Sequence, residues 1–217
     1  MKGRPESRAV PVAFVIALLA IMQYMPLRYR VLPAFLQLVL GAAFVIPMVA
    51  AALSPRNARV ARIERWTVLG TAGVIVALEV TLLGQLLFAM SSGGHTQGLA
   101  LLATAVGIWA SNVVVFALIF WQLDRGGSWG RASDWSGTAD FSFPRGDESE
   151  GVPRDWQPSF PDYLFLSFNT ATAFSPTDAT PLRARAKMLM LAESLVSLVT
   201  IVAVGARAIN LLGVMLF

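Results

Sequence analysis

Residues 98–121 read GLALLATAVGIWASNVVVFALIFW, a run without a single charged side chain. A helix of about 20 apolar residues is long enough to cross the hydrocarbon core of a bilayer. Comparable apolar runs lie near residues 9–27, 32–53, 67–90 and 186–212. The sequence therefore predicts an all-α integral membrane protein with five transmembrane helices.

The overall composition agrees with a lipid environment. Hydrophobic residues make up 56% of the chain and charged residues only 14%, whereas soluble domains carry about 25% charged residues. The net charge of +4 does not indicate nucleic acid, because the Arg residues cluster beside apolar runs, where they anchor helices at a membrane face. The expected partner is the lipid bilayer, with no nucleic acid.

The residue types that carry chemistry are scarce. The chain has no Cys and one His, His95, which stands in a Ser/Gly linker and reads as a solvated loop residue. Neither a nucleophile–base set nor a metal-ligand cluster is apparent. We therefore expect no enzymatic activity, no catalytic residues, no cofactor and no metal site.

The connector between the second and third apolar runs, Ser54 to Arg65, is basic. An Arg stands at every third position of it, at 56, 59, 62 and 65. This spacing is also found in voltage-sensor helices, but there the repeat lies within the span. Here the repeat precedes the apolar run, so an interfacial anchor is the favoured interpretation and a voltage sensor the alternative.

The one large polar segment runs from Gln122 to Phe160. Its Gly and Pro content predicts an irregular loop at residues 122–160 without a core of its own. Its aromatic residues are too many for a free linker and predict packing against the membrane helices or a neighbouring subunit. They are Trp129, Trp135, Phe141, Phe143 and Trp156.

A short helix is expected over residues 161–172, directly before the last apolar run. Ser159 can cap its N-terminus, Pro161 suits its first turn, and Asp162 complements the positive end of its dipole. A polar, non-helical segment follows at residues 173–178. A re-entrant pore loop has this same order of a short helix, a hydroxyl-rich loop and a full span. The alternative is an interfacial helix followed by an ordinary turn.

Residues 167–182 read SFNTATAFSPTDATPL. They resemble the pore helix, filter and exit of potassium-type ion channels, which typically read S-F-x-T-x-T-T-V-G-Y-G-D-x-x-P-L. The resemblance continues through Lys187 into the last apolar run with Glu193, and covers roughly residues 160–210. The matching positions are Ser167, Phe168, Thr170, Thr172, Asp178, Pro181 and Leu182.

Across its length the chain is also similar to a bacterial membrane family, domain of unknown function family 1345. The shared features are five spans, a basic second connector, an acidic Pro/Gly loop with the element Phe143-Pro144-Arg145-Gly146-Asp147-Glu148, and a pore-like segment before the last span. This resemblance implies an architecture and no established activity.

The filter-like loop departs from the channel pattern at its centre. Ser175, Pro176 and Thr177 stand where potassium filters carry Gly-Tyr-Gly. Those glycines allow the alternating backbone, partly at φ > 0, that aims carbonyls at the ion. Pro176 has its φ fixed and lacks an N–H. Residues Ala173 to Asp178 should therefore not form stacked carbonyl rings, and potassium selectivity by the usual mechanism is rejected.

The segment still offers oxygen atoms to a cation. Hydroxyl groups come from Thr170, Thr172, Ser175 and Thr177. In a symmetric oligomer, Asp178 would form a ring of charge at one mouth, or would instead cap the loop against Arg183 or Arg185. The remaining filter-like residues are Ala173 and Phe174, and Phe174 could plug the pore.

Two carboxylates fall inside apolar runs, Glu79 and Glu193. Charge at membrane depth costs at least about 2.5 kcal/mol, so each should face protein or water, or be protonated. Glu193 is expected to meet the short helix through Thr170 or Thr172. Glu79 is expected to find Gln85, Ser111 or Asn112. A structural hydrogen-bonding role is favoured for both, with proton relay as the alternative.

These observations predict two regions. Residues 1–97 would be a three-span membrane region, and residues 98–217 a pore-like module. A single copy cannot enclose a pore, so we expect a homotetramer. The expected function is a channel-like protein that passes small inorganic ions without conventional potassium selectivity. The alternative is a non-conducting membrane scaffold that retains the channel fold and binds partners.

The basic residues also predict an orientation. By parity, the N-terminus, the second connector, the long loop and the filter end share one side of the membrane. Of the 17 Lys and Arg residues, only Arg28, Arg30 and Arg207 fall on the other side. The positive-inside rule then places the N-terminus and the filter end in the cytoplasm of an inner-membrane (plasma-membrane) protein. This would invert the pore module relative to ordinary channels, unless one span is misassigned.

Overall fold

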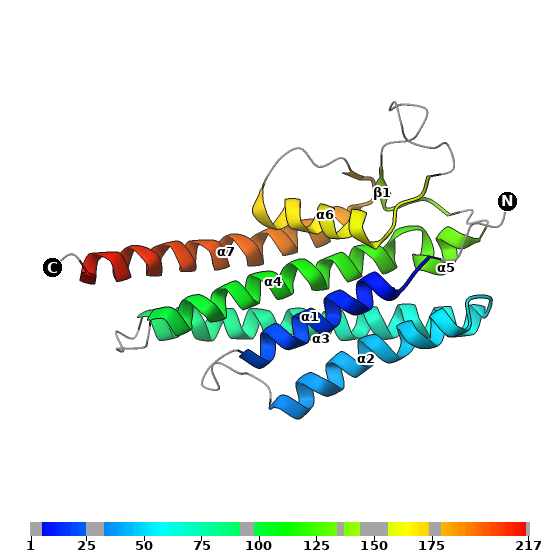
Figure 1. Ribbon diagram of the computed structural model, residues 1–217. Helices are drawn as coiled ribbons and strands as arrows, with labels where there is room; N and C mark the ends of the chain where they lie inside the picture. Colours follow the sequence, from blue (N-terminus) through cyan, green and yellow to red (C-terminus); the bar gives the residue numbers. More distant parts are fainter. Residues whose placement is uncertain are drawn as a thin grey trace.

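The computed structural model describes residues 6–24, 33–91, 98–133, 137–143, 156–173 and 179–215, and its long helices form a bundle (Figure 1). The long helices are α1 (Ala9–Tyr24), α2 (Ala34–Leu53), α3 (Ala58–Ser91), α4 (Gly98–Leu123) and α7 (Ala184–Met215). The short elements are η2 (Asp124–Gly126), α5 (Gly127–Ala132), β1 (Phe141–Ser142), α6 (Phe160–Thr172) and β2 (Thr180–Pro181).

Four of the described helices, α2, α3, α4 and α7, are long and apolar enough to cross a membrane. The predicted all-α fold with membrane-crossing helices is confirmed to this extent. The first helix is shorter than the predicted run 9–27, because α1 has 16 residues, or about 24 Å at the rise of an α-helix. Residues 25–27 of that run lie outside the described ranges.

The helix α3 begins earlier than predicted, at Ala58 instead of residue 67. Asn57 Oδ1 accepts hydrogen bonds from the backbone N–H groups of Arg59 at 3.0 Å and Val60 at 3.4 Å, as an N-cap does. The predicted connector Ser54 to Arg65 is therefore too long, because its residues from Ala58 onward belong to α3. Its Arg repeat lies mostly on the first turns of α3, where polar side chains can continue a helix beyond its apolar part.

An ion pair between Arg8 and Glu64 fixes the buried face of the first turns of α3. Glu64 is fully buried, and its carboxylate accepts hydrogen bonds from Arg8 Nε at 3.3 Å and Nη2 at 3.2 Å. Arg8 Nη2 also donates to Ser128 Oγ at 2.9 Å. The segment before α1, the start of α3 and α5 are therefore joined at one end of the bundle, the polar end. The exposed Arg59 and Arg62 lie on the opposite face of α3.

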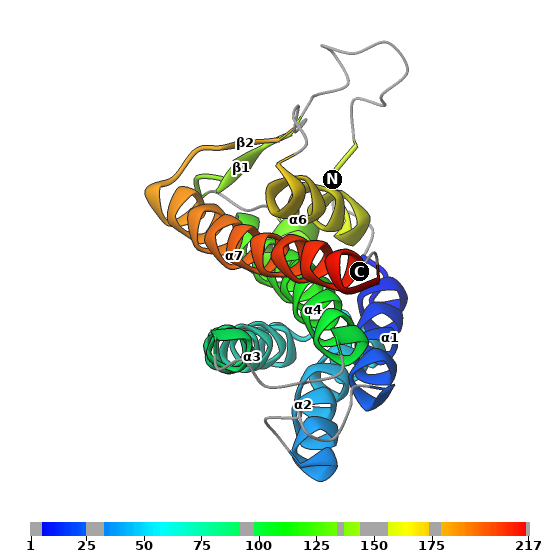
Figure 2. The same cartoon turned by 90° about the vertical axis from the view of Figure 1, so that its left-hand side faces the viewer.

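The helix α4 is the centre of the bundle. In its membrane-crossing stretch 72% of the residues are buried, against 22–28% in the other three helices. It packs against α3 and α1 on one side and against α6 and α7 on the other (Figure 2). Its charge-free sequence suits this place, since a helix that is apolar all round is surrounded by protein or lipid.

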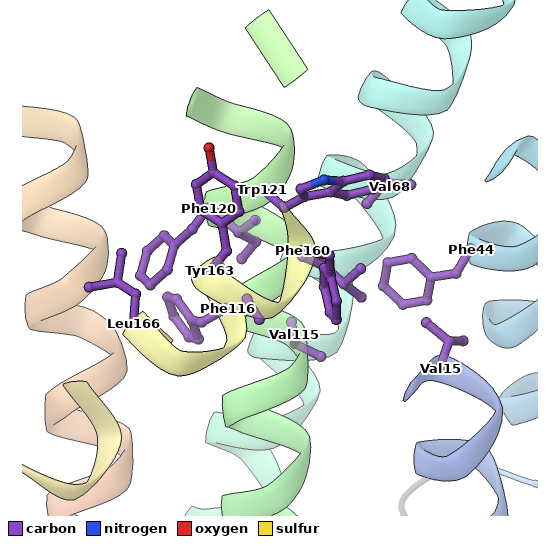
Figure 3. Packing of buried hydrophobic residues seen from close by; sticks show 14 of the residues in the cluster. Val15, Phe44, Val68, Val115, Phe116, Phe120, Trp121, Phe160, Tyr163 and Leu166 are labelled. Atoms are coloured by element: carbon purple, nitrogen blue, oxygen red, sulfur yellow. The ribbon is translucent and has the colours of Figure 1, made fainter. Parts of the chain in front are cut away.

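The core consists mainly of aromatic and branched side chains from α1, α2, α3, α4 and α6, together with Ala186 of α7. Figure 3 shows Phe116, Phe120 and Trp121 of α4 packed among side chains of α6, with Val68 of α3 nearby. The rings of Trp121 and Phe160 meet edge to face at 5.9 Å, a favoured aromatic geometry. On the other side of the core lie Val15 of α1 and Phe44 of α2. The short helix α6 is thus part of the main core.

The stretch 122–160 is more ordered than the predicted irregular loop, because α4 continues to Leu123 and α5 follows. The turn between them is made by three residues with positive φ: Arg125, Gly126 and Gly127. Gly127 has φ 79° and ψ −166°, a region that only glycine occupies readily. A Cβ there would also lie 2.6 Å from Gln122 Oε1.

The predicted packing of this stretch against the membrane helices is confirmed for its central aromatics. Phe141 and Phe143 are buried, and the Phe143 ring contacts Tyr163 of α6 at 5.3 Å and Trp156 at 6.1 Å. The strand β1 pairs antiparallel with β2, which precedes α7. Of the other predicted aromatics, Trp129 is half-buried and Trp135 lies outside the described residues.

Candidate functional site

The helix α6 begins where the sequence predicts. The carboxylate Oδ2 of Asp162 accepts hydrogen bonds from the backbone N–H and the hydroxyl of Ser159, both at 2.8 Å. Ser159 and Asp162 form a capping box, in which the cap residue and the third helical residue satisfy each other's backbone. Phe160 and Pro161 form the first turn. The predicted N-terminal cap is confirmed, and the helix extends to Thr172 as predicted.

A residue distant in sequence also caps α6. Glu6 Oε1 accepts hydrogen bonds from the backbone N–H of Phe160 at 3.0 Å and from Trp121 Nε1 at 2.7 Å. Its other oxygen, Oε2, pairs with Arg131 Nη2 at 2.8 Å. A carboxylate at this position satisfies a free N–H group and complements the helix dipole. The segment before α1 thus fixes the N-terminus of α6.

The buried Arg131 links Glu6 to α4 and α6. Its guanidinium lies 5.8 Å from the Trp121 ring centre and 5.1 Å from that of Tyr163, within the range of cation–π attraction. It also donates to the carbonyl oxygens of Trp121 at 2.7 Å and Asp124 at 3.1 Å. A buried cation needs this number of partners, because its desolvation costs several kcal/mol.

Asp124, also at the polar end, is fully buried and accepts several hydrogen bonds. Its Oδ2 accepts a hydrogen bond from the Tyr163 hydroxyl at 2.7 Å. Its Oδ1 accepts from the backbone N–H groups of Asp140 at 2.8 Å and Phe141 at 3.3 Å. Burial raises the pKa of the Tyr163 phenol well above its ordinary value, so the hydroxyl keeps its proton and donates. Asp124 thereby ties α6 to β1.

The start of α7 is fixed at the same end. Arg185 Nε and Nη2 donate to the two carboxylate oxygens of Asp140 at 2.5 and 2.7 Å, a two-point contact that sets the direction of the pair. Leu182 N–H donates to Asp140 O at 2.8 Å. Of the two residues predicted as alternative partners of Asp178, Arg185 is therefore already engaged.

The middle of α6 contacts α4 and α7 through polar groups. The Ser167 hydroxyl donates to Val113 O at 2.7 Å and is also hydrogen-bonded to Glu193 Oε1. Glu193 is fully buried within the bundle. The predicted contact between Glu193 and the short helix is confirmed, but it is made by Ser167 and not by Thr170 or Thr172. Those two side chains are bonded within their own helix.

The hydroxyl groups of Thr170 and Thr172 donate to Leu166 O at 2.8 Å and Phe168 O at 2.7 Å. Their oxygen lone pairs stay available to a ligand. Ala173 ends α6 in the left-handed conformation, with φ 55°, as in a common helix stop.

The other filter-like residues, Phe174, Ser175, Pro176, Thr177 and Asp178, lie outside the described residues. The path of the loop backbone therefore stays a prediction.

The second intramembrane carboxylate, Glu79, is buried with an exposed fraction of 1%. Of its predicted partners, Gln85 is exposed, and Asn112 donates to Glu193 O at 3.2 Å and Ser197 Oγ at 2.8 Å. Ser111 faces Glu79, but neither the carboxylate oxygens nor the Ser111 hydroxyl has a hydrogen bond of ordinary geometry within the described part of the chain. Of the three predicted partners, only Ser111 faces Glu79, so the predicted hydrogen-bonding role of Glu79 stays a prediction.

Sequence reasoning missed the polar-end residues Glu6, Asp124, Arg131, Asp140 and Tyr163. A charged residue followed by Gly126-Gly127 marks the end of a span, and this signal could have drawn attention to Asp124. No local sequence signal identified Glu6 or Arg131, because the two residues pair across 125 positions of the chain.

Among the described residues, no three His, Cys, Asp or Glu side chains are grouped as metal ligands are. Comparisons of the chain with protein-family models, with curated proteins and with solved structures found no match. The resemblances to potassium-type pore modules and to family 1345 therefore stay predictions.

The role of Glu6 can be tested by substitution. Glu6→Ala should lower the free energy of unfolding by about 3–5 kcal/mol, because it leaves the buried Arg131 without its counter-ion. Glu6→Gln keeps an acceptor for Phe160 N–H and Trp121 Nε1 and should cost less. Thermal unfolding in detergent measures both. Equal stability of Glu6→Ala and wild type would contradict the assigned capping role.

Proposed function

We propose that α6 is a re-entrant pore helix and that the chain is a channel-like membrane protein that passes small inorganic ions. In this proposal α1, α2, α3, α4 and α7 are five spans, and α4, α6 and α7 form the pore module. The supporting observation is the course of the chain from Ser159 to Pro181, which starts and finishes at the polar end of the bundle.

The start of α6 lies against Glu6 and Trp121, and the Phe160 ring contacts Trp121. Eight residues later, the Phe168 ring contacts Trp109 at 5.8 Å, about 18 Å further along α4. The strand β2 is then back beside β1, which is bonded to Asp124. A 13-residue helix is only about 20 Å long and too short to cross a core of about 30 Å.

In this proposal the C-terminal end of α6 lies at membrane depth, beside the middle of α4. Partial negative charge at a helix C-terminus favours a cation nearby. The oxygen atoms of Thr170 and Thr172, together with the loop from Ala173 to Asp178, would supply ligands. Because glycines are absent from this loop, we propose weak or unconventional selectivity and not a potassium filter. Four copies would be needed to enclose such a pore.

The non-conducting scaffold is the second candidate. Two observations favour it. The hydroxyl groups of Thr170 and Thr172 already donate their protons to carbonyl oxygens within α6, and the Phe174 side chain is large enough to block a pore. Ion flux separates the two functions.

Purified protein reconstituted into vesicles is expected to pass small monovalent cations in an ion-flux assay. Thr172→Val should lower the flux, because it removes a hydroxyl oxygen at the C-terminal end of α6. The matched control is Thr81→Val: Thr81 on α3 is also exposed, and its hydroxyl donates to Ala77 O at 2.9 Å in the same geometry. Folded tetrameric protein without flux would support the scaffold. Equal loss in both variants would contradict a pore beside Thr172.

We further propose that the polar end faces the cytoplasm of the inner (plasma) membrane. This end gathers the segment before α1, the turn between α2 and α3, α5 and the start of α7 (Figure 1). Most of the basic residues that the structure describes lie in these segments. Basic residues in short connectors are retained on the cytoplasmic side.

The chain has no native Cys, so single cysteines report orientation cleanly. Thr138→Cys at the polar end should react with a membrane-impermeant thiol reagent only after cells are opened. Ser91→Cys, at the last residue of α3 and the opposite end, should react in intact cells. Labelling of Thr138→Cys in intact cells would restore the familiar outward-facing filter and refute the inverted orientation.

A further inference from the structure

The hydroxyl of Ser167 stands between two oxygen atoms. One is the carbonyl oxygen of Val113 on α4, at 2.7 Å, and the other is Oε1 of Glu193 on α7. A hydroxyl has one proton to donate and two lone pairs with which to accept. A carbonyl oxygen can only accept, so the contact with Val113 uses the proton of Ser167. The contact with Glu193 then requires a proton from the carboxyl group.

Among the described residues, no cation and no second hydrogen-bond donor contacts the Glu193 carboxyl group; Ser167 is its one side-chain partner. The side chain is fully buried, and its Oε2 has no hydrogen-bond partner among the described residues. Asn112 donates to the backbone oxygen of Glu193 and to Ser197, and not to the carboxylate. An unpaired carboxylate in such a place normally takes up a proton.

Within the described ranges, no cation approaches Glu193 from the elements packed against α7. The sequence of α4 from Gly98 to Leu123 contains no charged residue. On α6 the one ionisable acid is Asp162, which caps the helix, and Tyr163 is bonded to Asp124. Glu79 of α3, on the far side of α4, is itself an acid.

The basic residues of α7 itself are also remote from the carboxyl group. Arg185 is paired with Asp140. Lys187 is exposed, and its position six residues before Glu193 places it about 120° around the helix and about 9 Å along it. Arg207 lies fourteen residues after Glu193, about 21 Å along the helix.

We infer that Glu193 is a proton-binding site: its carboxyl group is protonated and donates to Ser167, which donates in turn to Val113 O. The ligand is a single proton, and the chain of two hydrogen bonds joins α7, α6 and α4. The proton therefore helps to hold α6 in place at its midpoint. This inference does not depend on whether the protein conducts ions.

Glu64 provides a matched control. It is as deeply buried as Glu193, but its carboxylate forms an ion pair with Arg8 and accepts a hydrogen bond from Ser128, so we expect it to be ionised near neutral pH. The two acids differ in charge partners and not in burial. Any method that counts protonated carboxyl groups should separate them.

The test is infrared difference spectroscopy on the full chain in vesicles, near neutral pH. Glu193→Gln should lose a carboxylic-acid C=O band that wild type shows, and Glu64→Gln should lose none. Glu79→Gln is measured alongside, so that any band from Glu79 is assigned separately. An unchanged carboxylic-acid band in Glu193→Gln, with a lost carboxylate band instead, would overturn the inference.

A second measurement follows the effect of the proton on stability. The folded state holds a proton that an exposed Glu releases above a pH of about 4.3, so wild type should lose thermal stability relative to Glu193→Gln as the pH rises above that value. A pH-independent difference in melting temperature between the two proteins would also overturn the inference. The common titration of other groups cancels in this difference.

Discussion

A short helix inside a membrane bundle must have its backbone ends satisfied by protein, because lipid cannot hydrogen-bond to them. In this chain the constraint would fall on α6, because we propose that its 13 residues end at membrane depth. Asp162 and Glu6 satisfy its first N–H groups, and Ser194 Oγ donates to Thr170 O at 3.3 Å near its other end. The placement of α6 depends on these contacts.

The N-terminal cap explains why so many charges are buried at one end. Glu6 needs Arg131 to neutralise it, and Arg131 needs the rings of Trp121 and Tyr163. Tyr163 in turn donates to Asp124, which holds β1. Each member satisfies the next, as buried polar networks require. The ion pairs and hydrogen bonds within the network offset the desolvation cost of these charges. They also fix the orientation of α6, since no member can move alone.

The charge-free apolar runs of the sequence were sufficient to predict four long helices, and the capping residues were sufficient to predict the start of α6. Charge-free runs and the Ser159–Asp162 cap are local signals, and both act within a few residues. The beginning of α3 was misplaced because Glu64 is buried by a partner 56 residues away. The role of Glu6 was equally hidden, because it caps a helix 154 residues later. Ser167 was overlooked as the partner of Glu193 because helix rotation cannot be read from spacing alone.

The central claim is that α6 enters the membrane and that the chain returns to the same side. Spin labels at Ser159, Phe165, Thr172 and Thr180, introduced as single cysteines, would report their depth in a bilayer through access to oxygen and to a water-soluble relaxation agent. The account predicts shallow labels at 159 and 180, with depth that increases from 165 to 172. An equally shallow position for all four would show a helix that lies on the membrane surface and would contradict the account.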